Sequence, residues 1–543
     1  MDALFTVPTP QNEPVKGYAP GTPERASLQA KLTELQAKEH DLDMYISGEW
    51  RRGNGEAIKV VQPHKHSHVL GVTHAATGAQ AAEAVAAAKA AKREWASMDF
   101  ADRAAIFLRA AELIAGPYRD TLNGATMLGQ SKTAAQTEID AACELIDFLR
   151  FNVHFAEQIY AKQAQSSAGL WNRTDHRPLD GFVYAITPFN FTAIAGNLPT
   201  APALMGNTVV WKPATTQQFA ANFLVQILEE AGLPGGVINM VTGPGPEISD
   251  VVMADPDLAG IHFTGSTRVF QSLWKHVGEN ISSYRSYPRL VGETGGKDFI
   301  IAHPSANIDQ LAVAMTRGAF EYQGQKCSAV SRTYMPRSLW EGGLKDQVLD
   351  ITSQIKYGDV TDFDHFGGAV IDERAYAKHT ALFKRVADDK EATVIAGGTA
   401  DDSVGYFVQP TIIEATNPEH EVFTDEYFGP ITSVYVFDDS DFDSVVRQAA
   451  DVAPYALTGG IFANDRAAIA RASEELRFAA GNYYINDKPT GAVVGQQPFG
   501  GSRGSGTNDK AGSWQNLVRW ISPRSIKENF VPPVDWKYPH MGA

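Results

Sequence analysis

The sequence predicts an α/β protein of two or three domains, and three observations carry this expectation. The chain has 543 residues, which exceeds the roughly 250 to 300 residues that one hydrophobic core usually supports. From Leu179 onward, short apolar runs alternate with helical segments, as they do in strand-helix-strand units of a parallel sheet. A second region with this alternation covers about residues 297–486. We therefore expect two separate α/β domains, the first with an open, doubly wound sheet.

The individual elements follow from hydrophobic periodicity and composition. Before the first α/β region, helices are expected at residues 22–40 and in the alanine-rich stretch 79–95, and the first 25 residues are expected to form a surface arm. In the first α/β region we expect strands at 181–186, 208–211, 237–241 and 260–263, and helices at 216–231 and 246–253. In the second region, strands are expected at 299–302, 406–414 and 433–437.

Charge and cysteine content restrict the partners and the compartment. The net charge of −16 disfavours nucleic acid and acidic membranes, so a small-molecule partner is expected. The two cysteines, Cys143 and Cys327, are too few for a disulfide scaffold and fit a reducing compartment. The N-terminal residues resemble neither a secretory signal nor an Arg-rich transit peptide, and no apolar run is long enough to span a membrane. The cytoplasm is the expected compartment, with the mitochondrial matrix as the alternative for a processed protein.

Cys327 is the first candidate for chemistry. It lies in EYQGQKCS, where glycine and polar residues favour an exposed side chain, and the neighbouring Lys326 would favour a reactive thiolate. The alternative is an inert cysteine, as expected for Cys143 in its apolar helical run.

Two further motifs contain candidate groups. Glu293 lies among three glycines in LVGETGGK, a turn in which its carboxylate could act as a general base. Asn190 in ITPFNFT follows the first strand of the predicted sheet, where its amide could donate to an oxyanion. A solvated turn glutamate and an ordinary turn asparagine are the alternatives.

These three motifs, in this order, resemble those of the aldehyde dehydrogenase superfamily, and the resemblance covers about residues 43–522. It implies that Cys327 is the nucleophile, Glu293 the general base and Asn190 the oxyanion-binding amide. It also implies a Rossmann-like NAD-binding domain, an α/β catalytic domain and a small oligomerisation flap. NAD is the implied cofactor, and no metal is expected.

The implied domain boundaries are as follows. Residues 1–150 form an arm and the first part of the NAD-binding domain, 151–181 an oligomerisation hairpin, 182–293 the rest of the NAD-binding domain, 294–486 the catalytic domain, 487–513 an anchor loop returning to the NAD-binding domain, and 514–543 an oligomerisation tail. A homodimer or larger homo-oligomer is expected, in which the tail and the hairpin around 164–177 cover a neighbouring subunit.

The cofactor turn is expected in GIHFTGSTRVF, which reads as strand, glycine turn and helix. The resemblance assigns it Phe263, Thr264, Gly265 and Ser266. Many family members have glycine where this chain has Phe270, which predicts a wider turn.

The remaining cofactor contacts also come from the resemblance. Lys212 is implied to bind the adenosine ribose, although Thr215 replaces a glutamate found in many relatives, so discrimination against NADP is less certain. Glu426 and Phe428 in DEYFGP are implied to contact the nicotinamide half. A strand-end lysine, a surface acid and a core aromatic are the alternatives for these three side chains.

The segments YQGQKCSA, VGYFVQPTI, YINDKPTGAVVGQQPFGGSRGSGTNDK and RWISP resemble one branch of the superfamily. Its members oxidise L-glutamate γ-semialdehyde, the open form of Δ1-pyrroline-5-carboxylate, to glutamate in the second step of proline breakdown. The resemblance implies that Ser328 and the backbone of Gly491 and Ala492 hold the substrate carboxylate, and that Phe191 and Phe499 enclose its carbon chain.

Several functions remain open besides this one. They are a dehydrogenase of another small aldehyde, a thiol acyl transferase or hydrolase without redox chemistry, a glutamyl phosphate reductase, and a binding protein without activity. A transient contact with proline dehydrogenase, which would supply the substrate, is a further expectation.

Overall fold

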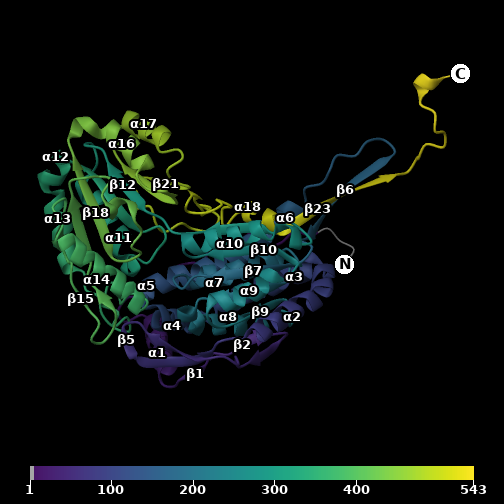
Figure 1. The fold of residues 1–543 in the computed structure, drawn as a ribbon, viewed down its shortest axis with the longest axis horizontal. Helices are drawn as coiled ribbons and strands as arrows, with labels where there is room; N and C mark the ends of the chain where they lie inside the picture. The colour runs from purple at the N-terminus through teal and green to yellow at the C-terminus, as the bar shows by residue number, and fades with distance from the viewer. Residues whose placement is uncertain (1–4, 543) are drawn as a thin grey trace.

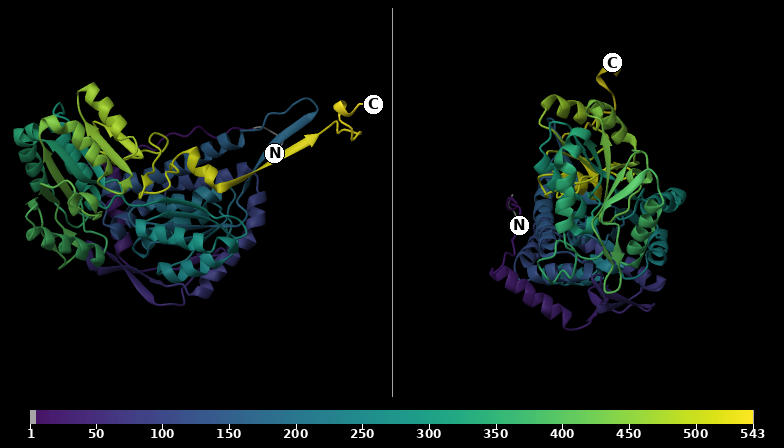
Figure 2. Two further views of the ribbon diagram at one scale, coloured as in Figure 1. Left: turned by 45° about the horizontal axis from the view of Figure 1, so that its top comes forward. Right: turned by 90° about the vertical axis from the view of Figure 1, so that its left-hand side faces the viewer.

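The computed structural model describes residues 5–542 and consists of two lobes, each built on a seven-stranded sheet (Figure 1). A two-stranded ribbon extends from one lobe, well beyond the rest of the fold (Figures 1 and 2). The α/β fold class predicted from the sequence is confirmed.

The sheet of the first lobe contains the predicted doubly wound core. Its strand order is β11 (Arg289–Glu293), β10 (Leu258–Thr264), β7 (Phe182–Thr187), β8 (Val209–Pro213), β9 (Ile238–Met240), β2 (Met44–Ile46) and β3 (Glu49–Arg51). The first five strands are parallel, and β2 is antiparallel to β9. The chain passes from β7 outward to β9, then returns to the other side of β7 as β10. The strand order therefore reverses between β7 and β10, and ligands of open α/β sheets bind at such a reversal.

Helices cover both faces of this sheet because side chains alternate along its buried strands. Phe182 and Tyr184 of β7 face one core, whereas Val183 and Ala185 face the other. The helices of the first core are α2 (Gly78–Ser97), α9 (Gly245–Ala254) and α10 (Thr267–Glu279). Those of the second are α3 (Phe100–Ala115), α6 (Glu144–Tyr160), α7 (Thr192–Leu204) and α8 (Gln218–Glu230).

Outside these two layers, α1 (Pro23–Gln36) packs on α4 (Arg119–Gln130), and β1 (His40–Asp41), β4 (Ala57–Gln62) and β5 (Lys65–His74) form a small sheet. The predicted N-terminal arm lies across the first lobe. Its backbone N–H groups at Val7, Glu13 and Lys16 donate to carboxylates of that lobe.

The sheet of the second lobe has the order β14 (Ala392–Ala396), β17 (Thr411–Ala415), β18 (Ile431–Phe437), β13 (Val330–Pro336), β12 (Asp298–Ala302), β20 (Thr458–Phe462) and β21 (Asn482–Ile485). All neighbours are parallel except β14 and β17. One face packs on α11 (Ile308–Phe320) and α13 (Lys345–Gln354), the other on α14 (Glu373–Ala387), α16 (Phe442–Asp451) and α17 (Arg466–Glu475).

The predicted helices and strands are found within a few residues of their expected bounds, with one exception. The run 406–414 was expected to be one strand, but it forms β16 (Phe407–Val408) and β17, which belong to different sheets. Pro410 lies between them and has no N–H to donate to a ladder, so one continuous strand is disfavoured.

The projecting ribbon pairs β6 (Leu170–Pro178) with β23 (Ile521–Asn529), antiparallel from Ile521 opposite Pro178 to Asn529 opposite Leu170. Two predicted boundaries next to it need correction. The hairpin was expected from residue 151, but α6 continues to Tyr160 because Ala156 and Ile159 still pack in the core. The tail was expected from residue 514, but Trp520 is fully buried in the first lobe, so the projecting part begins with β23.

Among residues 5–542, no helix is both long and apolar enough to cross a lipid bilayer.

Candidate active site

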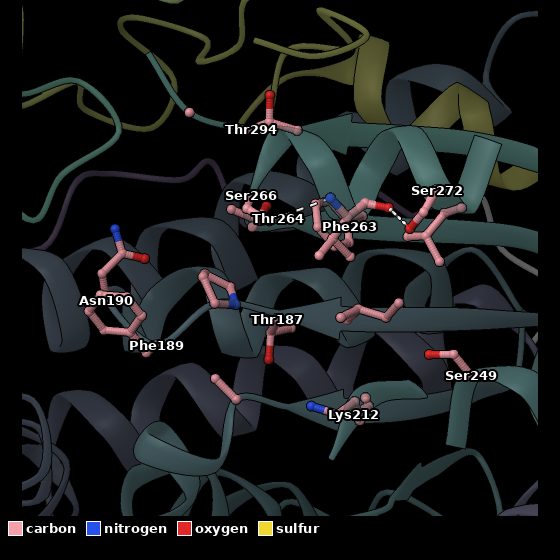
Figure 3. Close-up of a pocket in the computed structure, with 18 of the residues that line it drawn as sticks. Thr187, Phe189, Asn190, Lys212, Ser249, Phe263, Thr264, Ser266, Ser272 and Thr294 are labelled. Carbon is pink, nitrogen blue, oxygen red and sulfur yellow. Dashed lines mark hydrogen bonds between the residues drawn. The ribbon is translucent and has the colours of Figure 1, made fainter. Parts of the chain in front are cut away.

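A groove of about 800 Å³ lies where the strand order of the first sheet reverses. Residues at the carboxyl ends of β7, β8 and β10 line one side, and Glu426 and Phe428 of the second lobe line part of the other. Figure 3 shows several of these side chains converging on the groove, with Asn190 towards one end and Ser249 towards the other. All seven predicted cofactor residues line this one cavity.

Lys212 is the last residue but one of β8, at the edge of the groove (Figure 3). Its ammonium donates to the carbonyl of Pro213 at 3.2 Å, and no other protein hydrogen bond to it is found in the described chain. Burial lowers the pKa of Lys212 to about 8. A buried ammonium with so few partners can still donate to hydroxyl oxygens of a bound molecule.

The turn between β10 and α10 consists of only Gly265 and Ser266, and Ser266 caps the helix by accepting from Val269 N–H at 3.4 Å. The wider turn that Phe270 predicted is therefore wrong. The Phe270 ring instead points into the core, where it stacks on Phe263 at 5.3 Å. A side chain at Gly292 would meet the Phe270 ring at 2.1 Å, so glycine at 292 provides its space.

Glu426 approaches the backbone of the GETGG segment. Its Oε1 accepts from Gly296 N–H at 2.9 Å, and a Cβ at Gly295 would lie 2.1 Å from the carboxylate. The glycine at 295 is thus required by the close approach of Glu426. Burial raises the pKa of Glu426. Phe428 has a left-handed backbone (φ 57°), and its ring meets the edge of Phe189 at 5.8 Å.

Cys327 is buried, with only 8% of its surface exposed, so the predicted exposure is wrong. The predicted stabilisation of the Cys327 thiolate by Lys326 is also not found, because the Lys326 ammonium pairs with Asp140 at 3.7 Å and with Glu321 at 3.6 Å. The thiol instead donates to Glu293 Oε1 at 3.0 Å. Burial, and then the nearby Glu293 carboxylate, raise the pKa of Cys327 well above its ordinary value. The thiol is therefore protonated in this state.

Glu293 ends strand β11 and does not lie in the turn predicted for it. Its backbone is fixed from two directions, since Gly265 N–H donates to its carbonyl at 3.2 Å and Gly506 pairs with it in an isolated bridge. Burial raises the pKa of Glu293 to about 7, against the lowering effect of the Cys327 hydrogen bond and of Lys510. A carboxylate with this pKa, in contact with a thiol, can take up the thiol proton at neutral pH.

Asn190 is buried between the groove and the cysteine segment. Its Nδ2 donates to the carbonyl of Gln325 at 3.0 Å, two residues before Cys327. The structure thus brings Asn190, Glu293 and Cys327 together from three segments that are distant in sequence.

A second, narrower cavity lies on the other side of Cys327. All five predicted substrate contacts line it: Phe191, Ser328, Gly491, Ala492 and Phe499. The Ser328 hydroxyl donates to Thr490 Oγ1 at 2.8 Å. Cys327 lines both cavities, so it lies where the groove and this pocket meet.

Two acids of this second cavity, Asp140 and Glu144, were not predicted from the sequence. Asp140 accepts from Lys132 Nζ at 2.8 Å, whereas no hydrogen bond to the Glu144 side chain is found among residues 5–542. Burial, and then Asp140, raise the pKa of Glu144 well above its ordinary value. The sequence showed only a helical run here, but the segment Glu138–Cys143 is a π-helix, a distortion that often marks functional sites.

A dinucleotide-type sheet whose groove is lined by a cysteine in contact with a carboxylate is typical of an oxidoreductase that works through a covalent cysteine adduct. Comparison with known proteins supports this class. The model of the aldehyde dehydrogenase family matches residues 50–524. The chain belongs to the aldehyde dehydrogenase family and is an enzyme of that family.

Several similar proteins of this family are named as pyrroline-5-carboxylate dehydrogenases. The chain is 49% identical over 539 residues to the delta-1-pyrroline-5-carboxylate dehydrogenase of Agaricus bisporus, covering 99% of this chain and 98% of that protein. It is also similar to a crystal structure of the Mycobacterium tuberculosis Delta-pyrroline-5-carboxylate dehydrogenase, with 58% identity, a TM-score of 0.97 and full coverage of both chains. The structure of that protein bound with NAD gives 57% identity, a TM-score of 0.96 and again full coverage of both.

Proposed function

We propose that this enzyme oxidises L-glutamate γ-semialdehyde to L-glutamate with NAD⁺, as a step of proline breakdown. One observation carries the proposal: Cys327 lies between a dinucleotide-sized groove and a second cavity that contains polar anchors, with Glu293 at 3.0 Å from its sulfur. The names of the similar proteins in Agaricus bisporus and Mycobacterium tuberculosis agree with this substrate.

The groove fits NAD⁺ along its length. Lys212 would donate to the adenosine ribose, the N-terminus of α10 would face the pyrophosphate, and Glu426 would accept from the nicotinamide ribose. The Lys212 ammonium, with its single backbone partner, fits this role because a ribose hydroxyl would satisfy its remaining donors. When bound, NAD⁺ supplies the hydride acceptor of the reaction.

The protein residues would act in two stages. Glu293 first takes the Cys327 proton, and the thiolate attacks the aldehyde carbon, forming a hemithioacetal whose oxygen is stabilised by the Asn190 amide and the Cys327 N–H. After oxidation to the thioester, Glu293 releases this proton to solvent and then takes a proton from water, which attacks the acyl carbon and releases glutamate and the Cys327 thiolate. The pKa of about 7 suits Glu293 for both proton transfers.

The second cavity provides partners for both charges of the substrate. Ser328 and the backbone of Gly491 and Ala492 would hold the α-carboxylate, because small residues permit close approach of backbone N–H groups. Glu144, which faces this cavity, would accept from the α-ammonium and ionise on doing so. A simple aliphatic aldehyde would leave these groups without partners.

The decisive experiment is a steady-state assay of NADH formation by the purified protein, with L-glutamate γ-semialdehyde compared with its shorter homologue and with uncharged aldehydes of equal length. We expect the highest kcat/KM for the glutamate derivative, and a lower value with NADP⁺. Equal kcat/KM for uncharged aldehydes would favour a different aldehyde as the substrate. Thioester turnover without NADH formation would favour the non-redox acyl transferase.

We also propose a homodimer held by the projecting ribbon and tail. Trp171, Phe530, Val531, Trp536 and Tyr538 are all exposed, and the last two expose 76% and 68% of their surface. Apolar groups of this size, gathered on an extension, are typical of a surface covered by another subunit. Sedimentation equilibrium of the chain should give at least twice the monomer mass, and a chain ending at residue 529 should dissociate more readily.

A further inference from the structure

A left-handed turn of three residues precedes the reactive cysteine. Tyr322 (φ 50°, ψ 42°), Gln323 (φ 51°, ψ 32°) and Gly324 (φ 62°) all have positive φ. Only Gly324 adopts this conformation without strain, whereas Tyr322 and Gln323 have a Cβ that opposes it. Strained residues of this kind persist only where the surroundings hold them, and they concentrate at functional sites. The contacts that hold this turn therefore bear on Cys327, three residues beyond it.

The Gln323 side chain makes two of these contacts. It is fully buried, and its amide Nε2 donates to the carbonyl of Ser131 at 2.9 Å and to that of Ala369 at 2.8 Å. Ser131 belongs to the first lobe and Ala369 to the second. One amide group thus ties the turn to both lobes.

Ser131 is itself firmly placed. It ends α4 in a left-handed conformation (φ 57°), its hydroxyl accepts from Ala369 N–H at 2.9 Å, and His64 Nδ1 lies 3.1 Å from the same oxygen. A Cβ at Gly368 would lie 2.2 Å from this oxygen, so glycine at 368 permits the close approach of Ser131. The Ser131 carbonyl is therefore a fixed acceptor for Gln323.

The residues on either side of Gln323 are also held by side-chain contacts, up to Gln325. The Lys132 ammonium lies 4.4 Å from the centre of the Tyr322 ring. Gln325 Oε1 accepts from Ile371 N–H at 2.9 Å, and its carbonyl accepts from Asn190. Residues 322, 323 and 325 are each held, which leaves little freedom to the backbone that places the Cys327 sulfur.

We propose that Gln323 is a positioning residue, whose amide locks the left-handed turn against Ser131 and Ala369 and so places the Cys327 sulfur beside Glu293. Gln323 lines neither cavity described above, so it acts through Cys327 and not on the substrate. The inference deepens the proposed function and rests on it for its kinetic part. Loss of the amide should release the turn and let the buried sulfur move away from Glu293.

The test compares three variants. Gln323→Met keeps the length of the side chain and removes both hydrogen bonds. Gln323→Gly also removes them but relieves the backbone strain, so it provides a second variant if the methionine variant does not fold. Gln218→Met is the control, since Gln218 is a fully buried glutamine of the first lobe whose amide donates to Asn222 and Met240.

Two measurements decide the outcome. We expect kcat to fall on the order of 10- to 100-fold in both Gln323 variants, because displacement of a reacting atom slows the chemical step. The KM for NAD⁺ should stay within about twofold of the wild-type value, because the cofactor groove is not altered. Iodoacetamide labelling of Cys327, followed by peptide mass, should become faster because the sulfur gains exposure. Labelling of the buried Cys143 should not change, which excludes general unfolding.

Unchanged kcat and unchanged Cys327 labelling in both Gln323 variants would overturn the proposal. A glycine variant with wild-type kcat would also overturn it, because the turn would then place Cys327 correctly without the two hydrogen bonds once the backbone strain is relieved. An equal effect of Gln218→Met would also overturn it. If the wild-type protein does not oxidise the semialdehyde, the proposed function fails, but the labelling measurement still tests the positioning role because it needs no substrate.

Discussion

Replacing Glu293 by glutamine should stabilise the protein, and the stabilisation should grow with pH. Burial raises the Glu293 pKa from 4.5 to about 7, so the folded state favours the protonated acid. Between these two values the folded protein binds more protons than the unfolded chain, and stability falls as the pH rises. Above about pH 7 the full penalty of a buried carboxylate is present. Glutamine does not titrate and still offers an oxygen to the Cys327 thiol.

The size of the effect follows from the pKa difference. At about 1.36 kcal/mol per pKa unit, the rise from 4.5 to about 7 corresponds to at most roughly 3 kcal/mol. Because the Glu293 side chain retains some exposure, about 1 to 3 kcal/mol is the realistic range. An unfolding entropy of about 2.1 cal/mol/K per residue gives roughly 1.1 kcal/mol/K for 543 residues. The melting temperature should therefore rise by about 1 to 3 °C.

The measurement is a thermal melt of wild type, Glu293→Gln and the control Glu94→Gln at about pH 5 and about pH 8.5, without cofactor. Glu94 is an exposed glutamate on α2. The advantage of Glu293→Gln should be small at the lower pH and largest at the higher one. If the difference does not increase with pH, or if wild type is the more stable protein at about pH 8.5, the assignment of a raised pKa to Glu293 is wrong.

The remaining predictions concern activity. Cys327→Ala should lower kcat by at least about 10³-fold while NADH binding, measured by fluorescence, is retained; substantial residual turnover would contradict a covalent mechanism. Lys212→Met should raise the KM for NAD⁺ roughly 10- to 100-fold, because a hydrogen bond from a charged group is lost, and an unchanged KM would place the ribose elsewhere. Wild-type kcat/KM should increase with pH through an apparent pKa near 7, since Glu293 must be ionised to act as the base, and a flat profile from pH 6 to pH 8 would argue against this role.

Much of the site was predictable because its chemistry lies in short motifs. Cys327, Glu293 and Asn190 each stand in a glycine-rich or proline-containing segment, and the structure brings these three residues together. The cofactor and substrate residues also gather in the two cavities that meet at Cys327. Their roles in catalysis remain predictions for the experiments above.

Other features could not be predicted because they depend on residues that are distant in sequence. The sequence suggested an exposed Cys327 whose thiolate is stabilised by Lys326. In the structure the thiol is buried, and the Lys326 ammonium forms ion pairs with Asp140 and Glu321. Phe270 suggested a wide turn, but the space at Gly292 accommodates its ring. Asp140 and Glu144 carried no motif; Asp140 lies in the π-helix and Glu144 begins α6, and both line the pocket.

The sequence by itself determined the α/β class, the order of the strands along the chain and the residue types that carry the chemistry, because hydrophobic periodicity and short motifs are local properties. The tertiary structure alone decided the raised pKa values of Cys327 and Glu293 and the left-handed turn that precedes the cysteine. Burial and hydrogen bonds between separate segments set these properties, and they arise only when segments 34 residues apart, as for Glu293 and Cys327, or 192 residues apart, as for Ser131 and Gln323, pack together.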